Sequence, residues 1–208
     1  MTNRIAHAFL AAALFLPLGG AAPPAPTPKP DPVSAVDGTI RVALDTPAGR
    51  IVVALDQRHA PATTANFLRY VDARRFDGIN FYRAMQWGSG NGLIQGGITK
   101  DARLLYPPVK HEATATTGLT HKQGTISMAN FGPGTARSDF FILAGPIPAL
   151  DSGPGKPGFA AFGQVVEGME VVTAILAAPV SPTRGEGALK GQMLNPAVTI
   201  RTVRRVAR

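Results

Sequence analysis

The sequence predicts a mainly β domain, built as a barrel or sandwich of antiparallel strands and capped by helices. Short runs of β-branched and aromatic residues recur along most of the chain, which is typical of strands. Loops rich in turn formers separate these runs, since 23 glycines and 19 prolines are spread among the 208 residues. Helical periodicity is confined to two segments, and no unit of about 20 to 50 residues repeats, which excludes solenoids and propellers.

The folded part is predicted to open with a β-hairpin followed by a helix. Residues 39–45 and 50–56 are β-rich runs, and Thr-Pro-Ala-Gly at 46–49 is a turn between them. The segment 60–72 has a proline near its start and one apolar stripe at helical spacing. That stripe consists of Ala60, Thr64, Phe67, Leu68 and Val71.

The remaining elements are predicted to be strands, except for one short helix. The strands are expected at 79–85, 124–129, 139–144, 160–166 and 197–206, and the helix at 168–177. Turn formers bound each of these apolar runs. Since every predicted element follows residue 37, we expect residues 38–208 to form one domain.

The first 22 residues have the three parts of a secretory signal peptide. Arg4 supplies a positive start, residues 8–18 form an uncharged apolar stretch, and residues 17–22 contain a helix breaker followed by small residues. The apolar stretch is shorter than the roughly 20 residues of a membrane-spanning helix. We therefore expect residues 1–22 to be a cleaved signal, the protein to be periplasmic in a bacterium, and the mature chain to have no transmembrane segment. An uncleaved N-terminal anchor is the alternative.

A proline-rich linker, residues 23–37, separates the signal from the domain. Prolines at this density lack backbone donors and favour the extended polyproline II conformation. We therefore expect a stiff tether. The Pro-x-x-Pro spacings within it leave open a role in recognition by a partner.

Composition excludes several kinds of chemistry. The chain has no cysteine, which removes disulfides, thiolate nucleophiles and Cys–zinc sites. Its four histidines have no metal-binding spacing, so we expect neither a metal nor another cofactor. The net charge of +8 raises the possibility of a nucleic-acid partner, but we expect none for an exported protein. The arginines near the C-terminus are interpreted as the solvated edge of a strand.

Several short blocks follow one another in a definite order along the predicted domain. They are Phe81-Tyr82-Arg83, Ile94-Gln95-Gly96-Gly97, Ser127-Met128-Ala129-Asn130, Asp139-Phe140-Phe141-Ile142 and Phe162-Gly163-Gln164-Val165-Val166-Glu167-Gly168-Met169. In order and spacing they resemble the cyclophilin family of peptidyl-prolyl cis-trans isomerases, over about residues 39–206. The resemblance implies an eight-stranded antiparallel barrel capped by two α-helices, with the substrate groove on its outer face.

Isomerisation of an X–Pro bond fits the chemistry that the composition leaves open. The barrier to rotation about a peptide bond is about 18–20 kcal/mol, and no covalent bond breaks, so neither a nucleophile nor a metal is needed. In the twisted state the prolyl nitrogen becomes a better hydrogen-bond acceptor. A donor aimed at that nitrogen therefore stabilises the transition state more than either ground state.

The resemblance also implies roles for particular residues. It makes Arg83 catalytic, with Gln95 helping to position both the arginine and the substrate carbonyl. The substrate-binding positions that it implies are Phe81, Leu93, Ala129, Asn130, Asp139, Phe141, Leu150 and Phe159. Phe141 is expected at the floor of a proline pocket, and Asn130 as an anchor for the peptide backbone. Without the resemblance, Arg83 and Gln95 are ordinary surface residues and Asn130 is a turn former, and for Phe81 a place in the core stays open.

We expect a diverged groove, because several positions depart from the family pattern. Gly92 stands where the family has an aromatic wall residue, Asp139 where it has a glutamine, and Phe159 near its usual histidine. Trp87, in an unusual insert, is a candidate replacement for the aromatic lost at Gly92. Ala149 stands where eukaryotic members have a tryptophan that contributes to cyclosporin binding, so we expect a cyclosporin-insensitive protein.

Two functional hypotheses follow. In the first, the protein is a periplasmic peptidyl-prolyl isomerase that acts as a monomer on proline-containing peptides and unfolded exported proteins. In the second, the same fold is a peptide-binding chaperone or scaffold with little or no catalysis. A hydrolase triad of His121 and Asp139 with Ser127 or Ser138 is disfavoured, because no Gly-x-Ser-x-Gly elbow is present.

Overall fold

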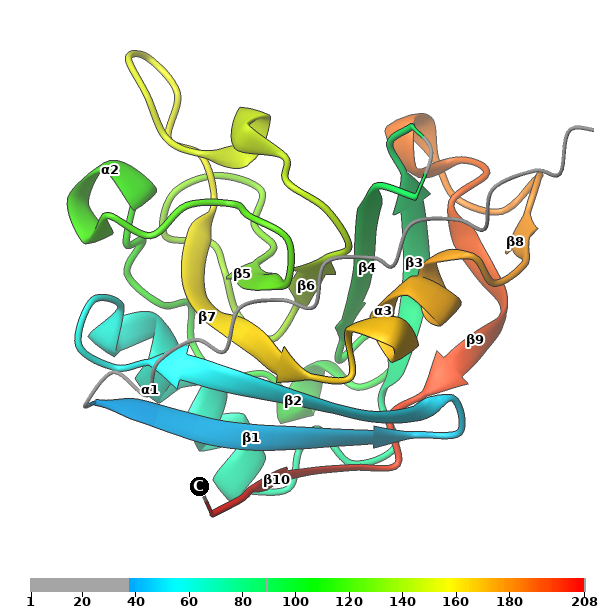
Figure 1. Ribbon diagram of the computed structural model, residues 1–208, viewed down its shortest axis with the longest axis horizontal. Coiled ribbons are helices and arrows are strands. Elements are labelled where there is room, and N and C mark those ends of the chain that lie inside the picture. The colour runs from blue at the N-terminus through cyan, green and yellow to red at the C-terminus, as the bar shows by residue number, and fades with distance from the viewer. Residues whose placement is uncertain (1–37, 89, 208) are drawn as a thin grey trace, which may run out of the picture. The chain divides into compact units, whose positions relative to one another are not determined.

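The computed structural model describes residues 38–88 and 90–207. The signal peptide expected at 1–22 and the linker expected at 23–37 lie outside the described residues. Figure 1 shows that the described part is a strongly curled sheet with short helices packed against it.

The strands are β1 (Thr39–Thr46), β2 (Gly49–Asp56), β3 (Asn80–Gln86), β4 (Gly92–Gly97), β5 (Thr125–Met128), β6 (Phe140–Leu143), β7 (Ala160–Glu167), β8 (Val180–Ser181), β9 (Met193–Thr199) and β10 (Thr202–Arg205). The helices are α1 (Pro61–Asp72), α2 (Thr114–Thr117) and α3 (Met169–Leu176). Single 3-10 turns occur at η1 (Ala102–Leu104), η2 (Pro148–Leu150) and η3 (Gly187–Leu189).

All strand pairs are antiparallel, in the order β10-β1-β2-β7-β5-β6-β4-β3-β9-β8. The chain itself links the two ends of this strand order, because β9, near one end, continues through Ile200 and Arg201 into β10 at the other. The N–H of Ile200 donates to the carbonyl of Ile79 beside β3, and the N–H of Arg201 donates to that of Asp45 in β1, both at 2.7 Å. This crossing brings β3 and β1 together and curls the sheet into a barrel.

The expected class, a mainly β antiparallel barrel with helical caps, is confirmed, although the described residues contain ten strands rather than eight. The last predicted strand, 197–206, is split into β9 and β10 because the chain changes neighbours at Ile200. Strand β4 is not among the predicted strands: three of its six residues are glycine, which weakens the local strand signal.

Helix α1 has the start and the buried face that the sequence predicts. Pro61 occupies its first turn, and the carboxylate of Glu112 accepts hydrogen bonds from the N–H groups of Ala62 and Thr63 at 3.0 and 2.8 Å. The negative charge of Glu112 also suits the positive end of the helix dipole. All five positions of the predicted apolar stripe are buried.

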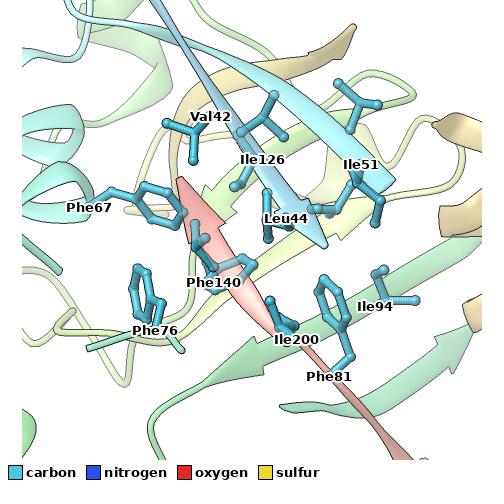
Figure 2. Packing of buried hydrophobic residues seen from close by; sticks show 14 of the residues in the cluster. Val42, Leu44, Ile51, Phe67, Phe76, Phe81, Ile94, Ile126, Phe140 and Ile200 are labelled. Carbon is cyan, nitrogen blue, oxygen red and sulfur yellow. The ribbon is translucent and has the colours of Figure 1, made fainter. Parts of the chain in front are cut away.

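The main core lies inside the curled sheet and is rich in aromatic rings, as Figure 2 shows. The ring of Phe67 from α1 packs 5.0 Å from that of Phe76 and 5.3 Å from that of Phe140 in β6, measured between centroids. Phe81 of β3 joins the same group, with its ring 5.9 Å from Phe140. Because aromatic residues bury large apolar areas, this group stabilises the contact between α1 and the sheet.

Strands β4 and β6 carry apolar residues on both faces. Ile94 and Phe140 point into the main core, whereas their neighbours Leu93 and Phe141 belong to a second buried cluster on the opposite face. Side chains alternate between the faces of a strand, so one run of apolar residues supplies both clusters. The second cluster lies in the region where the resemblance predicts the substrate groove.

Candidate functional site

A β-bulge in strand β3 turns two consecutive side chains to the outer face of the sheet. Phe81 pairs with Gly96 of β4, but the next paired residue is Arg83, opposite Gln95, so Tyr82 is the extra residue. Phe81 is fully buried in the core, and both Tyr82 and Arg83 are half-buried outside it. Without the bulge, strict alternation would turn Arg83 inward with Phe81. The bulge therefore makes the arginine available to a ligand.

A row of directly paired residues crosses four strands on this outer face. Arg83 of β3 pairs with Gln95 of β4, Gln95 pairs with Phe141 of β6, and Phe141 pairs with Ser127 of β5. Neighbouring strands lie about 4.8 Å apart, so the backbone of Arg83 lies about 10 Å from that of Phe141. A long cationic side chain and a largely buried aromatic ring thus lie in one row on the same face of the sheet.

Three partners hold the guanidinium of Arg83. Its Nη1 donates to Gln95 Oε1 at 2.7 Å, its Nε to Gln192 Oε1 at 2.8 Å, and its Nη2 contacts Met85 Sδ at 3.4 Å. A guanidinium has five N–H donors, and the other two have no partner within the described part of the chain. Burial lowers the pKa of Arg83 from its ordinary value, but the group stays charged at neutral pH.

Gln192 is a site residue that the sequence does not reveal. It precedes β9, and its backbone carbonyl accepts a hydrogen bond from the N–H of Ala84 at 2.9 Å, which ties this segment to β3. Its Nε2 donates to the carbonyl of Ala188 at 2.8 Å, which leaves Oε1 for Arg83. It is 109 positions from Arg83 and belongs to no recognisable motif, so no local signal marks it.

The apolar cluster beside Arg83 is formed by Leu93, Phe141, Leu143 and Ile147, with Met85, Ala129, Leu150 and Phe159 packed against it. Phe141 lies between two other rings: the imidazole of His121 stacks on it at 6.0 Å and 19°, and Phe159 meets it edge-on at 5.5 Å and 86°. The structure thus brings together five predicted substrate-binding residues: Leu93, Ala129, Phe141, Leu150 and Phe159.

Asn130 follows strand β5, directly after Ala129 of the apolar cluster. Its Oδ1 accepts a hydrogen bond from the N–H of Gly132 at 2.9 Å, which fixes the side chain in a turn. Its Nδ2 is buried and has no hydrogen-bond partner among residues 38–88 and 90–207. Asn130 therefore has both the turn-forming contact and an unused donor.

One expectation about the outer face needs correction. Phe81 cannot line a substrate site, because its side chain is fully buried in the core against Phe140. Gly92 itself has no room for a side chain: a Cβ there would overlap the carbonyl of Met85, and φ is +147°. Trp87 is 53% exposed, and its role as a replacement for the aromatic lost at Gly92 stays a prediction.

Ser127, His121 and Asp151 are aligned like a catalytic triad but are closed to substrate. His121 Nδ1 lies 2.6 Å from Asp151 Oδ1, and His121 Nε2 lies 3.0 Å from Ser127 Oγ. The acidic partner is Asp151, not the Asp139 of the disfavoured triad. Since Ser127 is 0% exposed and His121 1%, no scissile bond can reach the hydroxyl. These residues support Phe141 from behind.

The described residues contain neither a metal-binding cluster nor a membrane-spanning helix. No group of three or more His, Asp or Glu side chains in 38–88 and 90–207 is arranged to hold a metal ion. In the same ranges no helix has the length and apolar character needed to cross a bilayer.

The family model described as "Cyclophilin type peptidyl-prolyl cis-trans isomerase/CLD" matches residues 39–204. The chain belongs to the cyclophilin-type peptidyl-prolyl cis-trans isomerases. This cyclophilin is 39% identical over 147 residues to peptidyl-prolyl cis-trans isomerase A of Dickeya dadantii, covering 69% of the chain and 75% of that relative. It is 36% identical over 151 residues to a peptidyl-prolyl cis-trans isomerase of Streptomyces antibioticus, covering 69% and 87%.

Solved structures show the same fold. A cyclophilin-type isomerase of Cryptosporidium parvum is similar with a TM-score of 0.66 at 20% identity, over 82% of this cyclophilin and 99% of the other chain. A structure of that isomerase in the presence of the dipeptide Ala-Pro gives a TM-score of 0.65 at 20% identity, covering 81% and 99%. At this identity the likeness is one of fold.

Proposed function

We propose that this cyclophilin accelerates X–Pro isomerisation in exported proteins as they fold in a bacterial periplasm, and that Arg83 is the catalytic donor. One observation carries the assignment of the site. The guanidinium of Arg83, with two unpartnered N–H donors, lies in the same paired row as Phe141, the central ring of the apolar cluster. The Ala-Pro dipeptide named with the Cryptosporidium parvum relative supports a proline-containing ligand.

The proposed mechanism divides the substrate between the two halves of the row. The proline ring packs on Phe141, because an apolar ring gains free energy when it leaves water for an aromatic surface. The prolyl nitrogen then faces Arg83. As the peptide bond twists, the nitrogen loses its resonance with the carbonyl and accepts a hydrogen bond from a free N–H of the guanidinium. The planar amide offers no such acceptor, so the bond favours the transition state over both isomers.

Gln95 and Asn130 are proposed to hold the peptide and the arginine in place. Gln95 Oε1 accepts from Arg83 at 2.7 Å, so the guanidinium is oriented before substrate binds. Asn130 has an unused amide donor that suits a peptide carbonyl. Asp139, in contrast, has its carboxylate engaged by the hydroxyl of Tyr82, and we assign it no contact with the peptide.

The proposal of export rests on the sequence. The charged start, apolar stretch and small residues of 1–22 support secretion, and the proline-rich segment 23–37 supports a tethered domain. Expression of the full chain in a bacterium, with a variant lacking residues 1–22 as the control, tests this assignment. We expect the full chain in the periplasmic fraction and the shortened one in the cytoplasm. Both in the cytoplasm would contradict export.

The catalytic assignment is tested by a protease-coupled assay on an Ala-Pro peptide, together with binding of the same peptide. A hydrogen bond from a charged donor contributes about 1.5–3 kcal/mol. Arg83→Ala should therefore slow turnover by roughly ten- to a hundredfold, while the melting temperature changes little. Full activity in Arg83→Ala would show that the site is assigned wrongly. Saturable binding by the unmodified protein without turnover would favour the chaperone or scaffold hypothesis.

A further inference from the structure

Tyr82, the extra residue of the β3 bulge, links Gln95 to the half-buried carboxylate of Asp139. Its hydroxyl donates to Asp139 Oδ1 at 2.9 Å, and the oxygen of that hydroxyl accepts from Gln95 Nε2 at 2.6 Å. Gln95 Oε1 in turn accepts from Arg83 at 2.7 Å. The four side chains form one continuous chain of hydrogen bonds, here called the relay, from Asp139 just before β6 to the guanidinium on β3.

The carboxylate at one end, which only accepts, and the guanidinium at the other, which only donates, fix the direction of every bond in this chain. An ionised carboxylate only accepts, so the single hydrogen of the Tyr82 hydroxyl points to Asp139. The phenolic oxygen is then left to accept, and it can pair only with the amide nitrogen of Gln95. The amide oxygen must therefore face Arg83. If the amide turned over, its NH2 group would meet the Nη1 donor of Arg83, and neither of these two N–H groups would have a partner.

The surroundings of Asp139 keep its carboxylate in one place. Gly97 of β4 leaves the space that this carboxylate occupies, because a Cβ at position 97 would overlap Asp139 Oδ1. The backbone carbonyl of Asp139 accepts from the N–H of Ala129 at 2.9 Å, and Ser138 Oγ lies 3.5 Å from its Oδ2. Burial raises the pKa of Asp139 above 3.8, whereas the bonds from Tyr82 and Ser138 oppose that rise. The hydroxyl of Tyr82 therefore lies closer to the carboxylate of Asp139 than the hydroxyl of Ser138 does.

We propose that Tyr82 and Asp139 are positioning residues, which hold the amide of Gln95 in the one orientation that presents its oxygen to Arg83. This inference rests on the catalytic role proposed for Arg83. It replaces the substrate-binding role that the resemblance implies for Asp139. The pair does not touch substrate and acts through Gln95 on the direction of the guanidinium. It therefore affects the rate at which the bound peptide isomerises rather than the affinity for the peptide.

The first test is Tyr82→Phe, which removes one oxygen and keeps the ring. Turnover of saturating peptide is measured by NMR exchange, and peptide affinity by titration. We expect turnover to fall by about three- to tenfold, with the dissociation constant unchanged within about twofold. The matched control is Tyr106→Phe. The Tyr106 ring contacts Arg69 and Arg75, neither of which belongs to this row, so the variant should keep the rate of the unmodified protein.

A double-mutant cycle with Gln95→Ala separates positioning from a merely structural role. Once Gln95 is removed the relay is already broken, so Tyr82→Phe should slow turnover no further in that background. Asp139→Asn gives a second measurement. Its amide still offers Tyr82 an acceptor but also a donor, so the direction of the relay is no longer imposed, and we expect a loss smaller than that of Tyr82→Phe.

Three outcomes overturn the proposal. They are full turnover in Tyr82→Phe, an equal loss from Tyr82→Phe with and without Gln95, and a change confined to peptide affinity. Arg83→Ala is measured alongside to separate this inference from the proposed function. If Arg83→Ala loses activity and Tyr82→Phe does not, only the relay is wrong. If Arg83→Ala keeps full activity, the catalytic assignment itself is wrong.

Discussion

The imidazole of His121 stacks on the ring of Phe141, with centroids 6.0 Å apart and planes 19° from parallel. Phe141 is the central ring of the outer apolar cluster, so the proposed proline surface rests directly on a buried histidine. The two ring nitrogens of His121 contact Asp151 and Ser127, which fixes the plane on which Phe141 lies.

Burial of His121 should make stability depend on pH. Burial lowers the pKa of His121 below 6.5, although the bond to Asp151 opposes this. As pH falls below about 6.5, the unfolded chain takes up a proton that the folded protein still refuses, so the free energy of unfolding decreases. The decrease ends at the lowered pKa of the folded state.

The measurement is urea unfolding of the unmodified protein and of His121→Gln, at pH values from about 7 down to about 5. The Gln variant is expected to be less stable at pH 7, because a buried network is broken. Its free energy of unfolding should change less with pH over this range. Equal slopes for the two proteins would show that His121 does not titrate differently on folding.

Arg83→Lys should rescue little of the activity that Arg83→Ala loses. The ammonium of lysine is a single point donor on a flexible stem, whereas the guanidinium bonds Gln95 and Gln192 at once and still has free N–H groups. We expect turnover within about threefold of that of Arg83→Ala in the protease-coupled assay. Turnover close to that of the unmodified protein would show that positive charge alone is enough.

Gln192→Ala should slow turnover, although no sequence motif marks Gln192 as a site residue. Arg83 Nε loses its acceptor, and the guanidinium gains a second orientation. We expect a three- to tenfold loss of turnover, about that of one hydrogen bond, with peptide affinity nearly unchanged. The control is Gln57→Ala, an exposed glutamine beyond β2. An equal effect of the two substitutions would remove Gln192 from the site.

Cyclosporin should inhibit this cyclophilin weakly. Ala149 lies exposed in η2, beside Leu150 of the apolar cluster, and offers neither an indole donor nor an aromatic face. Each such loss weakens binding by about 1–3 kcal/mol, and Gly92 and Phe159 add to the losses at Ala149, so we expect affinity to fall at least about a hundredfold relative to members with tryptophan there. Ala149→Trp should recover part of it in an inhibition titration. Nanomolar inhibition of the unmodified protein would contradict the alignment of η2.

The sequence by itself determined the fold class, the first hairpin, the buried face of α1 and the motif residues Arg83 and Gln95. These features are recorded locally, because strand and helix periodicities and turn residues act over a few neighbouring positions. Its prediction for Phe81 was ambiguous, since an aromatic residue on a strand suits either face of a sheet.

Only the tertiary structure decided how these residues meet. The β3 bulge, which turns Tyr82 and Arg83 to the same face, depends on the register between three strands and leaves no mark in the order of residues. The acid beside His121 is Asp151 rather than Asp139, and the second glutamine on the arginine is Gln192, because packing joins segments far apart along the chain. Hydrogen bonds depend on distance and direction in space, and a local pattern contains neither.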